Sequence, residues 1–403
     1  MSRTELLVIW MVLAAVGFAQ QSERNSSSRS KIFPKTFGGS RNHKIHESNS
    51  SQNSAHVPAS RRGIPGNHPH SWQRNEIVEV KVSDVARQYL TGLGTTVVIP
   101  FIYSFVFTAS LPLNLLAILV FIFKIGLTKP TAIYMMNLAA ADLLFVLLLP
   151  LKISYHFSGN DWGFGPFVCR LVTGGFYAYM CSSVLLMTCI SVDRYLAVVY
   201  PIKSASWRSR RRAAGLCLVA WLLSICSALP LFLTQQSVYV TNLNITTCHD
   251  VLTLPVLHTF SLYYFPSLCI LFFVIPLVVT TACYMKIIST LRSASAVNPY
   301  GKRRAFFLAI IVLCVFLVCF TPTNIVLLIH SLHFSTEPSD TLYFVYMLCV
   351  CLGSVSCCFD PLIYYYASSS FQNQLHHLLN SREDESIQVK ELINKPGTST
   401  PYL

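Results

Sequence analysis

Apolar residues in this chain of 403 residues gather into seven long runs that short polar stretches separate. Runs of about 18 or more apolar residues are long enough to cross a bilayer. We expect them to be helical, because backbone polar groups in lipid must be satisfied within the spanning segment. The predicted spans are residues 95–124, 131–157, 166–199, 213–233, 258–291, 304–332 and 340–368. The pattern therefore predicts an all-α membrane protein, a seven-transmembrane helix bundle.

A further apolar run, at the start of the chain, has a different character. Arg3 precedes a short apolar stretch, and a small-x-small pattern that ends at Ala19 follows it. These features are typical of a secretory signal peptide, here residues 1–19. Export then places residues 20–94 outside the cell. Because this tail is polar and has few aromatic or β-branched residues to bury, we expect it to be disordered.

Basic residues cluster in alternate loops between the predicted spans. They follow the first and third spans and precede the sixth, whereas the opposite loops are poor in Lys and Arg. Loops rich in Lys and Arg stay cytoplasmic, so the N-terminus lies outside and residues 369–403 form a cytoplasmic tail. The formal charge of +13 thus reflects topology at the plasma membrane and attraction to membrane lipids, and it does not indicate nucleic-acid binding.

Most of the fourteen cysteines lie within predicted spans. Cys169 and Cys248 are the two at predicted extracellular positions, where an oxidising compartment favours a disulfide. Glycosylation is expected at the exposed sites with the Asn-x-Ser/Thr pattern, which are Asn25, Asn49 and Asn244. The sequence has no Cys/His cluster with metal-ligand spacing, no nucleotide-binding glycine loop and no pair of catalytic carboxylates. We therefore do not expect an enzyme.

Several polar residues fall inside the predicted spans. Charges in a membrane are costly and mark candidate functional sites. The candidates for one polar network are Asn114, Asp142, Ser183 and Asp360. They could converge on a small cation such as sodium, and the alternative is a purely structural polar cluster. Beyond a possible sodium ion, no metal and no cofactor is expected.

The order of the motifs along the spans identifies a family. Asn114, Asp142, Trp221 and Pro276 accompany the motifs "DRY" (193–195), "CFTP" (319–322) and "DPLIY" (360–364). Together with seven helices, they resemble the rhodopsin-like G-protein-coupled receptors. The chain departs from the commonest pattern at Phe320, where Trp is usual, and at Asp360, where Asn is usual. The resemblance implies a partner, a heterotrimeric G protein, and residues that couple to it: Asp193, Arg194, Tyr195, Tyr284 and Tyr364.

A narrower resemblance covers residues 89–370 almost continuously. The stretches "FSGNDWGFG", "RYLAVVYPIKSASWR", "LNITTCHDVL" and "CCFDPLIYYYASS" are similar to the protease-activated, thrombin-type receptors. In that family a serine protease cuts the extracellular tail, and the new N-terminus folds back as a tethered agonist. By position, the resemblance implies a ligand pocket made by Tyr177, His249, Asp250, Leu252, His330, Tyr343 and Tyr346.

The tail holds two candidate cleavage sites for such a trypsin-like protease. In "FPKTFGGSRN", a cut between Lys35 and Thr36 would release a tethered ligand that starts with Thr36, Phe37, Gly38, Gly39, Ser40 and Arg41. In "SRRGIPGN", a cut between Arg62 and Gly63 is the alternative. The stretch "HKIHESNSSQNS" lacks the acidic, aromatic patch usual in thrombin-cleaved members. The activator is therefore thrombin acting slowly or another protease.

The cytoplasmic side offers further expected partners. "SSSFQNQLHHLL" has apolar residues at helical spacing, which predicts a short amphipathic helix on the membrane surface. Serines and threonines in the tail are candidate sites for receptor kinases and arrestin. Two alternatives to protease activation stay open: a receptor for a free peptide, nucleotide or lipid, and a non-signalling cofactor that presents protease to a neighbouring receptor.

Overall fold

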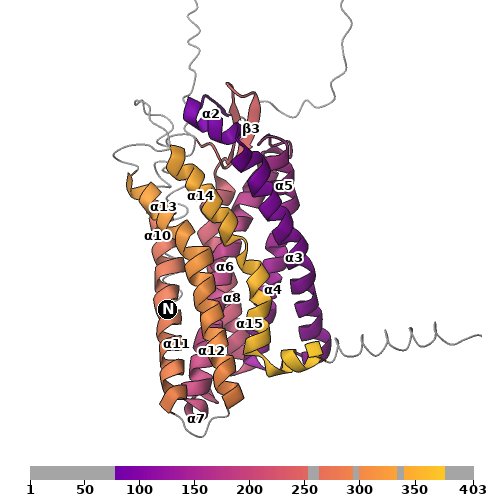
Figure 1. Cartoon of the computed structure of the whole chain (residues 1–403), viewed down its shortest axis with the longest axis vertical. Coiled ribbons are helices and arrows are strands. Elements are labelled where there is room, and N and C mark those ends of the chain that lie inside the picture. Colours follow the sequence, from indigo (N-terminus) through magenta and orange to yellow (C-terminus); the bar gives the residue numbers. More distant parts are fainter. Residues whose placement is uncertain (1–77, 253–262, 294–298, 334–339, 377–403) are drawn as a thin grey trace, which may run out of the picture.

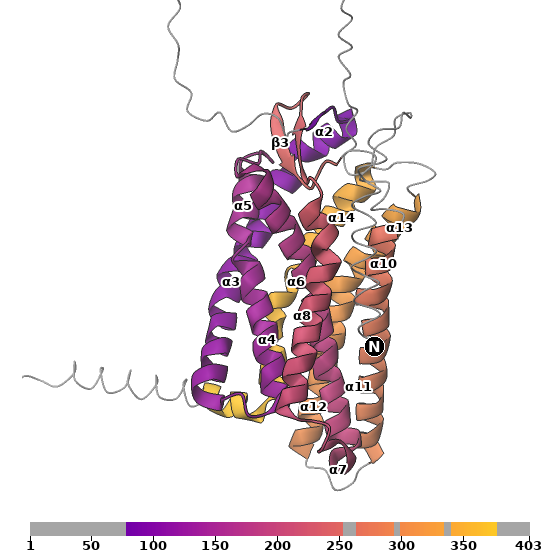
Figure 2. The same cartoon turned by 180° about the vertical axis from the view of Figure 1, so that it is seen from behind.

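Seven helical spans form a bundle in the computed structural model of the chain (Figures 1 and 2). The structure describes residues 78–252, 263–293, 299–333 and 340–376. The spans are Asp84–Ile125, Pro130–Phe157, Gly165–Val199, Arg210–Leu233, Phe265–Ser293, Pro299–Ser331 and Asp340–Ala367. The predicted number and order of the spans are thereby confirmed. The first helical run starts at Asp84, before the predicted residue 95, and the predicted start of the fifth span lies outside the described residues. The signal peptide, both candidate cleavage sites, Asn25 and Asn49 lie outside the described residues.

Several spans consist of more than one helical piece. Short π-helical turns interrupt the first, fifth and sixth spans, and irregular residues interrupt the second and seventh. The pieces are α2 (Asp84–Thr91), η2 (Gly94–Val98), α3 (Ile99–Val120) and η3 (Phe121–Ile125); α4 (Pro130–Val146) and α5 (Leu149–Phe157); α6 (Gly165–Val199); α8 (Arg210–Leu233); α10 (Phe265–Cys269), η5 (Ile270–Val274) and α11 (Ile275–Ser293); α12 (Pro299–Cys314), η6 (Val315–Phe320) and α13 (Thr321–His333); α14 (Asp340–Gly353) and α15 (Ser356–Ala367).

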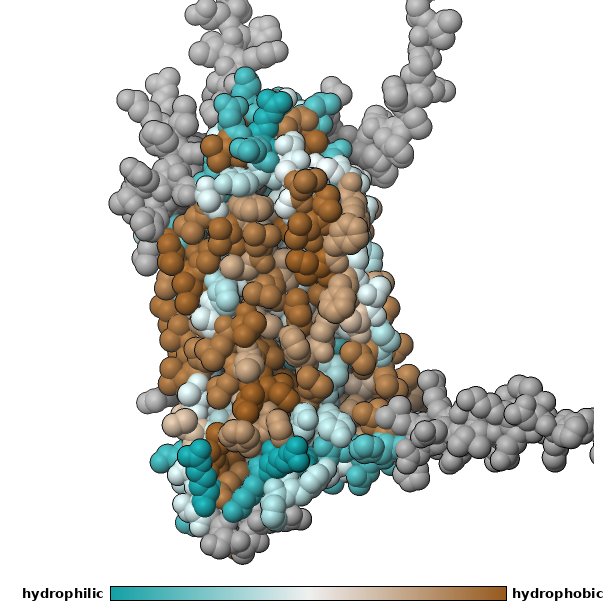
Figure 3. Space-filling view, viewed as in Figure 1, coloured by the Kyte–Doolittle hydropathy of each residue, from teal (hydrophilic) through white to brown (hydrophobic). Residues whose placement is uncertain are grey.

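The long helix α6 lies in the interior of the bundle and packs against α4, α8 and α11. Its buried side chains include Leu186, Met187 and Ile190, none of which is exposed. Large apolar side chains also cover the outside of the bundle, such as Phe123 and Leu317. They form a broad apolar belt with polar residues at both ends of the molecule (Figure 3). In a soluble protein this belt would be unfavourable, whereas here it is the surface that faces lipid.

The seventh span changes direction where its two helices meet. Its first helix ends at Gly353, and α15 starts at Ser356. A Cβ atom on Gly353 would lie 3.2 Å from the carbonyl oxygen of Cys319 in η6, so the absence of a side chain permits the close approach. The sixth and seventh spans are therefore packed backbone to backbone at this level.

A small sheet covers the extracellular end, which an all-α prediction missed. It has the order β1 (Val78–Val80), β2 (Ser237–Val240) and β3 (Ile245–Cys248). β2 and β3 form an antiparallel hairpin, and β1 pairs with β2 in parallel. Because β1 and α2 belong to the tail, the expectation that it is disordered up to residue 94 is wrong for residues 78–94.

At the cytoplasmic end, the short helix α7 (Pro201–Ser204) follows the third span. After α15 the chain forms a further helix from residue 369 to 376, at the place of the predicted amphipathic helix. Its Phe371 packs in a tilted contact against Phe121 and edge-on against Tyr364, with ring centroids 5.3 and 6.3 Å apart. This contact buries Phe371 under the bundle together with the neighbouring Gln372, while Asn373 and His376 stay exposed.

Candidate ligand-binding site

A cavity opens at the extracellular end, between the first, second, third and seventh spans and the loop that follows β3. It encloses about 690 Å³, part of it open to solvent. Most of its wall is apolar, with Phe145, Leu148 and Met347 among the lining residues. The cavity therefore suits an apolar group that carries a few polar atoms.

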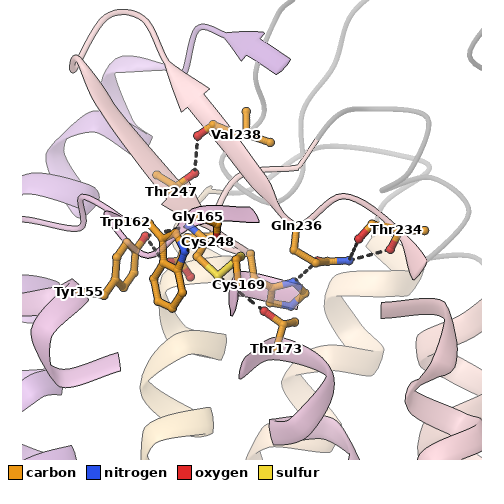
Figure 4. The surroundings of a disulfide bond; sticks show 12 residues. Tyr155, Trp162, Gly165, Cys169, Thr173, Thr234, Gln236, Val238, Thr247 and Cys248 are labelled. Carbon is orange, nitrogen blue, oxygen red and sulfur yellow. Dashed lines mark hydrogen bonds between the residues drawn. A yellow bond between two sulfur atoms is a disulfide. The ribbon is translucent and has the colours of Figure 1, made fainter. Parts of the chain in front are cut away.

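A disulfide holds the loop over this cavity. Cys248, the last residue of β3, is bonded to Cys169 near the start of α6, as predicted. Figure 4 shows Tyr155 and Trp162 beside the disulfide, and their rings are 5.6 Å apart in an edge-on contact. The backbone N–H of Trp162 also donates to the carbonyl of Thr246 in β3, at 2.7 Å. The disulfide thus attaches the hairpin to α6, and the Trp162 contact attaches it to the loop that precedes α6.

The residue after the disulfide turns the chain into the bundle. His249 has a φ of 72°, a left-handed conformation that is uncommon for residues other than glycine. As a result Asp250 points inward and is only 5% exposed. Its carboxylate accepts hydrogen bonds from the hydroxyls of Tyr155, at 2.7 Å, and Tyr343, at 3.2 Å. Within the described part of the chain, no Lys, Arg or His lies within ion-pair distance of Asp250.

A chain of polar side chains runs from the hairpin to the seventh span. The amide of Gln236 donates to Thr234, so its oxygen faces Nδ1 of His249 at 2.8 Å (Figure 4). Nδ1 must then carry the proton, and Nε2 accepts from the hydroxyl of Tyr177 at 3.3 Å. The hydroxyl of Tyr177 is in turn 2.7 Å from that of Tyr346. The arrangement suits a neutral His249 that carries its proton on Nδ1.

Burial is the main cause that lowers the pKa of His249, to about 4. The nearby ammonium of Lys152 lowers this pKa further, and Asp250 opposes both effects. Because the imidazole is neutral at neutral pH, it accepts a hydrogen bond without bringing a second cation into the cavity. Asp250 is thus the acidic group of the cavity, and Lys152 is its basic group.

The structure places five of the seven predicted pocket residues in the cavity wall, and these are Tyr177, His249, Asp250, Tyr343 and Tyr346. Leu252 is buried but does not line the cavity. His330 also lies outside the wall, although its ring is 6.0 Å from that of Tyr343.

Sequence reasoning missed polar residues of the same wall, chiefly Lys152, His156 and Tyr103. The signal for Lys152 was present, because a lysine inside a predicted span is costly unless it faces a cavity or a partner. Tyr155 gave no such signal. Its role as a donor to Asp250 depends on a contact across 95 residues of sequence.

The predicted polar network forms part of a buried cluster deeper in the bundle. The hydroxyl of Tyr364 donates to Asp142 at 3.1 Å and lies 3.3 Å from Oδ1 of Asn114. Asp142 and Asp360 are both buried and close enough to interact electrostatically. Both carboxylate oxygens of Asp360, one of Asp142 and the hydroxyl of Ser183 are buried and have no hydrogen-bond partner among the described residues.

At the cytoplasmic end, two of the predicted coupling residues, Asp193 and Arg194, form an ion pair at 2.9 Å. Asp193 also accepts from Thr131, at 2.8 Å, and from Nε and Nη2 of Arg208, at 2.9 and 3.1 Å. Arg208 was not among the predicted coupling residues, because only the fold brings its loop next to Asp193. The guanidinium of Arg194 reaches the seventh span as well, donating to the carbonyl of Ala367 at 3.3 Å.

The other predicted coupling residues are not hydrogen-bonded to this pair among the described residues. The ring of Tyr195 packs edge-on against Tyr200, at 5.8 Å. The hydroxyl of Tyr284 is buried and has no hydrogen-bond partner within the described ranges. Tyr364 is tied to the polar network rather than to Arg194. Among the described residues, therefore, neither Tyr284 nor Tyr364 is hydrogen-bonded to Arg194.

Comparisons with known proteins agree with this arrangement. The family described as 7 transmembrane receptor (rhodopsin family) matches residues 113–364. The chain is 50% identical over 335 residues to proteinase-activated receptor 1 of Xenopus laevis, covering 83% of this chain and 77% of that protein. Identity to the human proteinase-activated receptor 1 is 50% over 303 residues, 75% of this chain and 71% of that protein. Proteinase-activated receptor 2 of Rattus norvegicus is 41% identical over 317 residues, 77% and 79% of the two chains.

The chain therefore belongs to the rhodopsin family of seven-transmembrane receptors. It is a multi-pass receptor of the plasma membrane and not an enzyme. Within that family it belongs to the proteinase-activated receptors.

Proposed function

We propose that this chain is a G-protein-coupled receptor that an extracellular trypsin-like serine protease activates by cutting its tail after Lys35. The cut leaves a new N-terminus at Thr36, which folds back as a tethered agonist. The names of the relatives support activation by a protease, and the "FPKTFGGSRN" stretch supports the position of the cut. Lysine suits the acidic specificity pocket of a trypsin-like enzyme, and Thr36-Phe37 begins the ligand.

The position of Asp250 is the observation that carries this proposal. Cleavage creates an α-ammonium group, and a buried carboxylate whose hydrogen-bond partners among the described residues are two tyrosine hydroxyls is a suitable partner for it. The apolar wall around Phe145 and Leu148 offers a place for the ring of Phe37. Arg41 is a second candidate partner for Asp250, since its guanidinium can bind a carboxylate with two hydrogen bonds.

Tethering explains how a short peptide with modest affinity can activate. A flexible linker converts binding into an intramolecular step with an effective concentration of about millimolar. The agonist then shifts a pre-existing equilibrium of the bundle, so that its cytoplasmic end opens and exposes Arg194 to a G protein. Receptor kinases and arrestin would act afterwards on the cytoplasmic tail, which contains Ser381, Ser386 and Thr398.

A sodium ion is a further part of the proposal. Asp142 and Asp360 fit such an ion, because three of their four oxygens are buried without a hydrogen-bond partner among the described residues. Carboxylate, hydroxyl and amide oxygens are the donors that hard cations prefer. Asp142, Asp360, Ser183 and Asn114 would hold the ion, and its charge would offset that of the carboxylates. Asp360→Asn should then remove the dependence of agonist affinity on sodium concentration.

The decisive experiment compares two agonists on two receptors. Lys35→Ala should abolish protease-triggered calcium or G-protein signals and preserve the response to the free peptide Thr-Phe-Gly-Gly-Ser-Arg. N-terminal sequencing after protease treatment should show a new chain that starts at Thr36. If Lys35→Ala signals normally and Arg62→Ala does not, the ligand starts at Gly63. If protease causes no signal in the wild type, protease activation is wrong.

A further inference from the structure

We propose that residues Val78–Thr91, β1 and α2 together, form an anchor that fixes where the tether leaves the receptor, at the mouth of the cavity. This inference rests on the proposed function, since it concerns how a tethered agonist is presented. The inference goes beyond the proposed function, because it assigns a positioning role to a part of the tail that is not itself the ligand. The anchor is visible beside the hairpin in Figure 1.

The register of the sheet determines the exit point. Val78 pairs with Val238 and Val80 with Val240, in parallel. Ser237, the first residue of β2, pairs with Cys248, the last residue of β3. The chain before Val78 therefore joins the sheet at the end where Gln236 and His249 meet, and His249 lines the cavity. With ordinary strand spacings, Val78 lies about 8 Å from Gln236. An antiparallel β1 would have put the exit at the hairpin tip instead.

Hydrogen bonds attach the anchor to the hairpin. The backbone N–H of Thr241 donates to the carbonyl of Val80, at 2.9 Å. The side-chain amide of Asn242 donates to the carbonyl of Val82 at 3.0 Å and accepts from its N–H at 3.3 Å. Val80 is 1% exposed, so the strand is also buried against its neighbours. The attachment thus involves both main-chain pairing and one side chain that holds both polar groups of Val82.

A second set of contacts attaches the anchor to the seventh span. Ser83 accepts from the N–H of Ala86 at 3.0 Å, capping α2, and its hydroxyl donates to Asp340 at the start of α14. The ring of Tyr89 stacks on Phe344 with centroids 4.6 Å apart. Leu90 is fully buried. A segment held on two sides in this way cannot act as a free part of the tether.

The anchor shortens the linker, which is the chain between the ligand and the first fixed residue, Val78. The ligand ends at Arg41, so about 36 residues connect it to Val78, whereas about 53 would connect it to the first predicted span at residue 95. Because effective concentration falls roughly as the −3/2 power of linker length, the anchor raises it about twofold. The effect grows when the tail is short. With about 10 residues before Val78, releasing the anchor would lengthen the tether to roughly 27 residues and lower the effective concentration about fourfold.

The test therefore combines anchor variants with tail length. Ser83→Ala with Asn242→Ala removes the bonds to Asp340 and Val82 and alters no residue of the cavity wall. Thr91→Ala is the matched control, because that hydroxyl bonds only within its own helix, to Arg87. Each variant is placed in the full tail and in a tail that lacks residues 42–67. All tails carry Phe37→Leu so that the response after complete cleavage is not saturated.

We expect the double variant to lower the protease response about twofold in the full tail and about fourfold in the short tail, with an unchanged response to the free peptide. Hydrogen exchange over residues 78–91 verifies that the segment has been released. Equal losses for protease and free peptide, or a loss that does not depend on tail length, would overturn the anchor role alone. A wild-type receptor that does not respond to protease but responds to the peptide would instead disprove the proposed function, and the anchor role with it.

Discussion

The hydroxyl of Tyr343 donates a hydrogen bond to the carboxylate of Asp250 at 3.2 Å, which joins the start of the seventh span to the loop over the cavity. These residues are 93 positions apart in the sequence. Tyr155 of the second span donates to the same carboxylate. A ligand cation that approaches Asp250 therefore acts on two spans and one loop at once, which is a direct route from binding to rearrangement of the bundle.

Asp250→Asn should weaken the free peptide Thr-Phe-Gly-Gly-Ser-Arg about 10- to 100-fold, because a hydrogen bond to a charged group contributes roughly 1.5–3 kcal/mol. The measurement is a concentration–response curve for receptor at matched surface expression. N-acetylation of the peptide removes the α-ammonium and is the matched chemical control. It should weaken binding to the wild type and have little further effect on Asp250→Asn. If Asp250→Asn and N-acetylation weaken the peptide independently and additively, Asp250 binds a group other than the α-ammonium. Arg41 of the ligand would then be the first candidate.

Phe37→Ala should leave cleavage after Lys35 unchanged and remove most of the signal. If the ring fills the apolar part of the cavity, the loss is roughly 2–4 kcal/mol, as for a binding hot spot. Loss of an N-terminal epitope measures cleavage, and calcium release measures signalling. Ser40→Ala, a smaller change within the same ligand, should signal nearly normally. Equal signalling from both variants would show that the ring is not the anchor of the ligand.

Acidification should destabilise the loop over the cavity as the pH falls from about 6.5 towards 4, and the response to free peptide should weaken with it. The folded-state pKa of His249 is lowered to about 4, below the ordinary value of 6.5. Its contribution to the folded loop is therefore complete above about pH 6.5 and is lost as protons bind at lower pH. A protonated imidazole could no longer accept from Tyr177. His249→Gln should show a flatter pH profile over this interval. An equally steep profile in that variant would show that His249 is not the group responsible for the pH dependence.

Cys248→Ser should abolish the response to peptide, because β3 and the residues that follow it would no longer be held over the cavity. Loss of a native disulfide typically costs about 2–5 kcal/mol. The double variant with Cys169→Ser should behave like either single one, since both remove the same bond. Cys226→Ser, a change at a free cysteine, is the control for the substitution itself. Peptide mapping that finds both thiols free in the wild type would contradict the disulfide.

Arg194→Ala should abolish most G-protein activation while cleavage and surface expression stay nearly normal. Arg194 is held by Asp193 and by the carbonyl of Ala367, at the cytoplasmic end where a G protein would dock. Arg210→Ala removes an exposed cytoplasmic guanidinium and is the charge-matched control. Normal nucleotide exchange on the G protein with a well-expressed Arg194→Ala receptor would exclude the coupling role.

Some site residues were predictable because their signal is local. A carboxylate such as Asp142 within an apolar run, or a pair of cysteines at predicted extracellular positions, is noticed without knowing its neighbours in the fold. Arg208 and Tyr155 had no such signal, because arginines in cytoplasmic loops and tyrosines near the membrane surface are common. Their roles appear only where the fold brings them to Asp193 and Asp250.

By itself, the sequence determined that seven helices cross a membrane, in which direction, and which cysteines pair. Transfer of each segment from water to lipid depends on its own length and composition, so hydropathy is sufficient to find it. Only the tertiary structure decided that Val78 pairs in parallel with Val238, and that Asp250 meets Tyr155 and Tyr343. These contacts join residues some 90 to 160 positions apart. Their geometry depends on how the helices pack and where the disulfide holds the hairpin, which no local pattern of residues specifies.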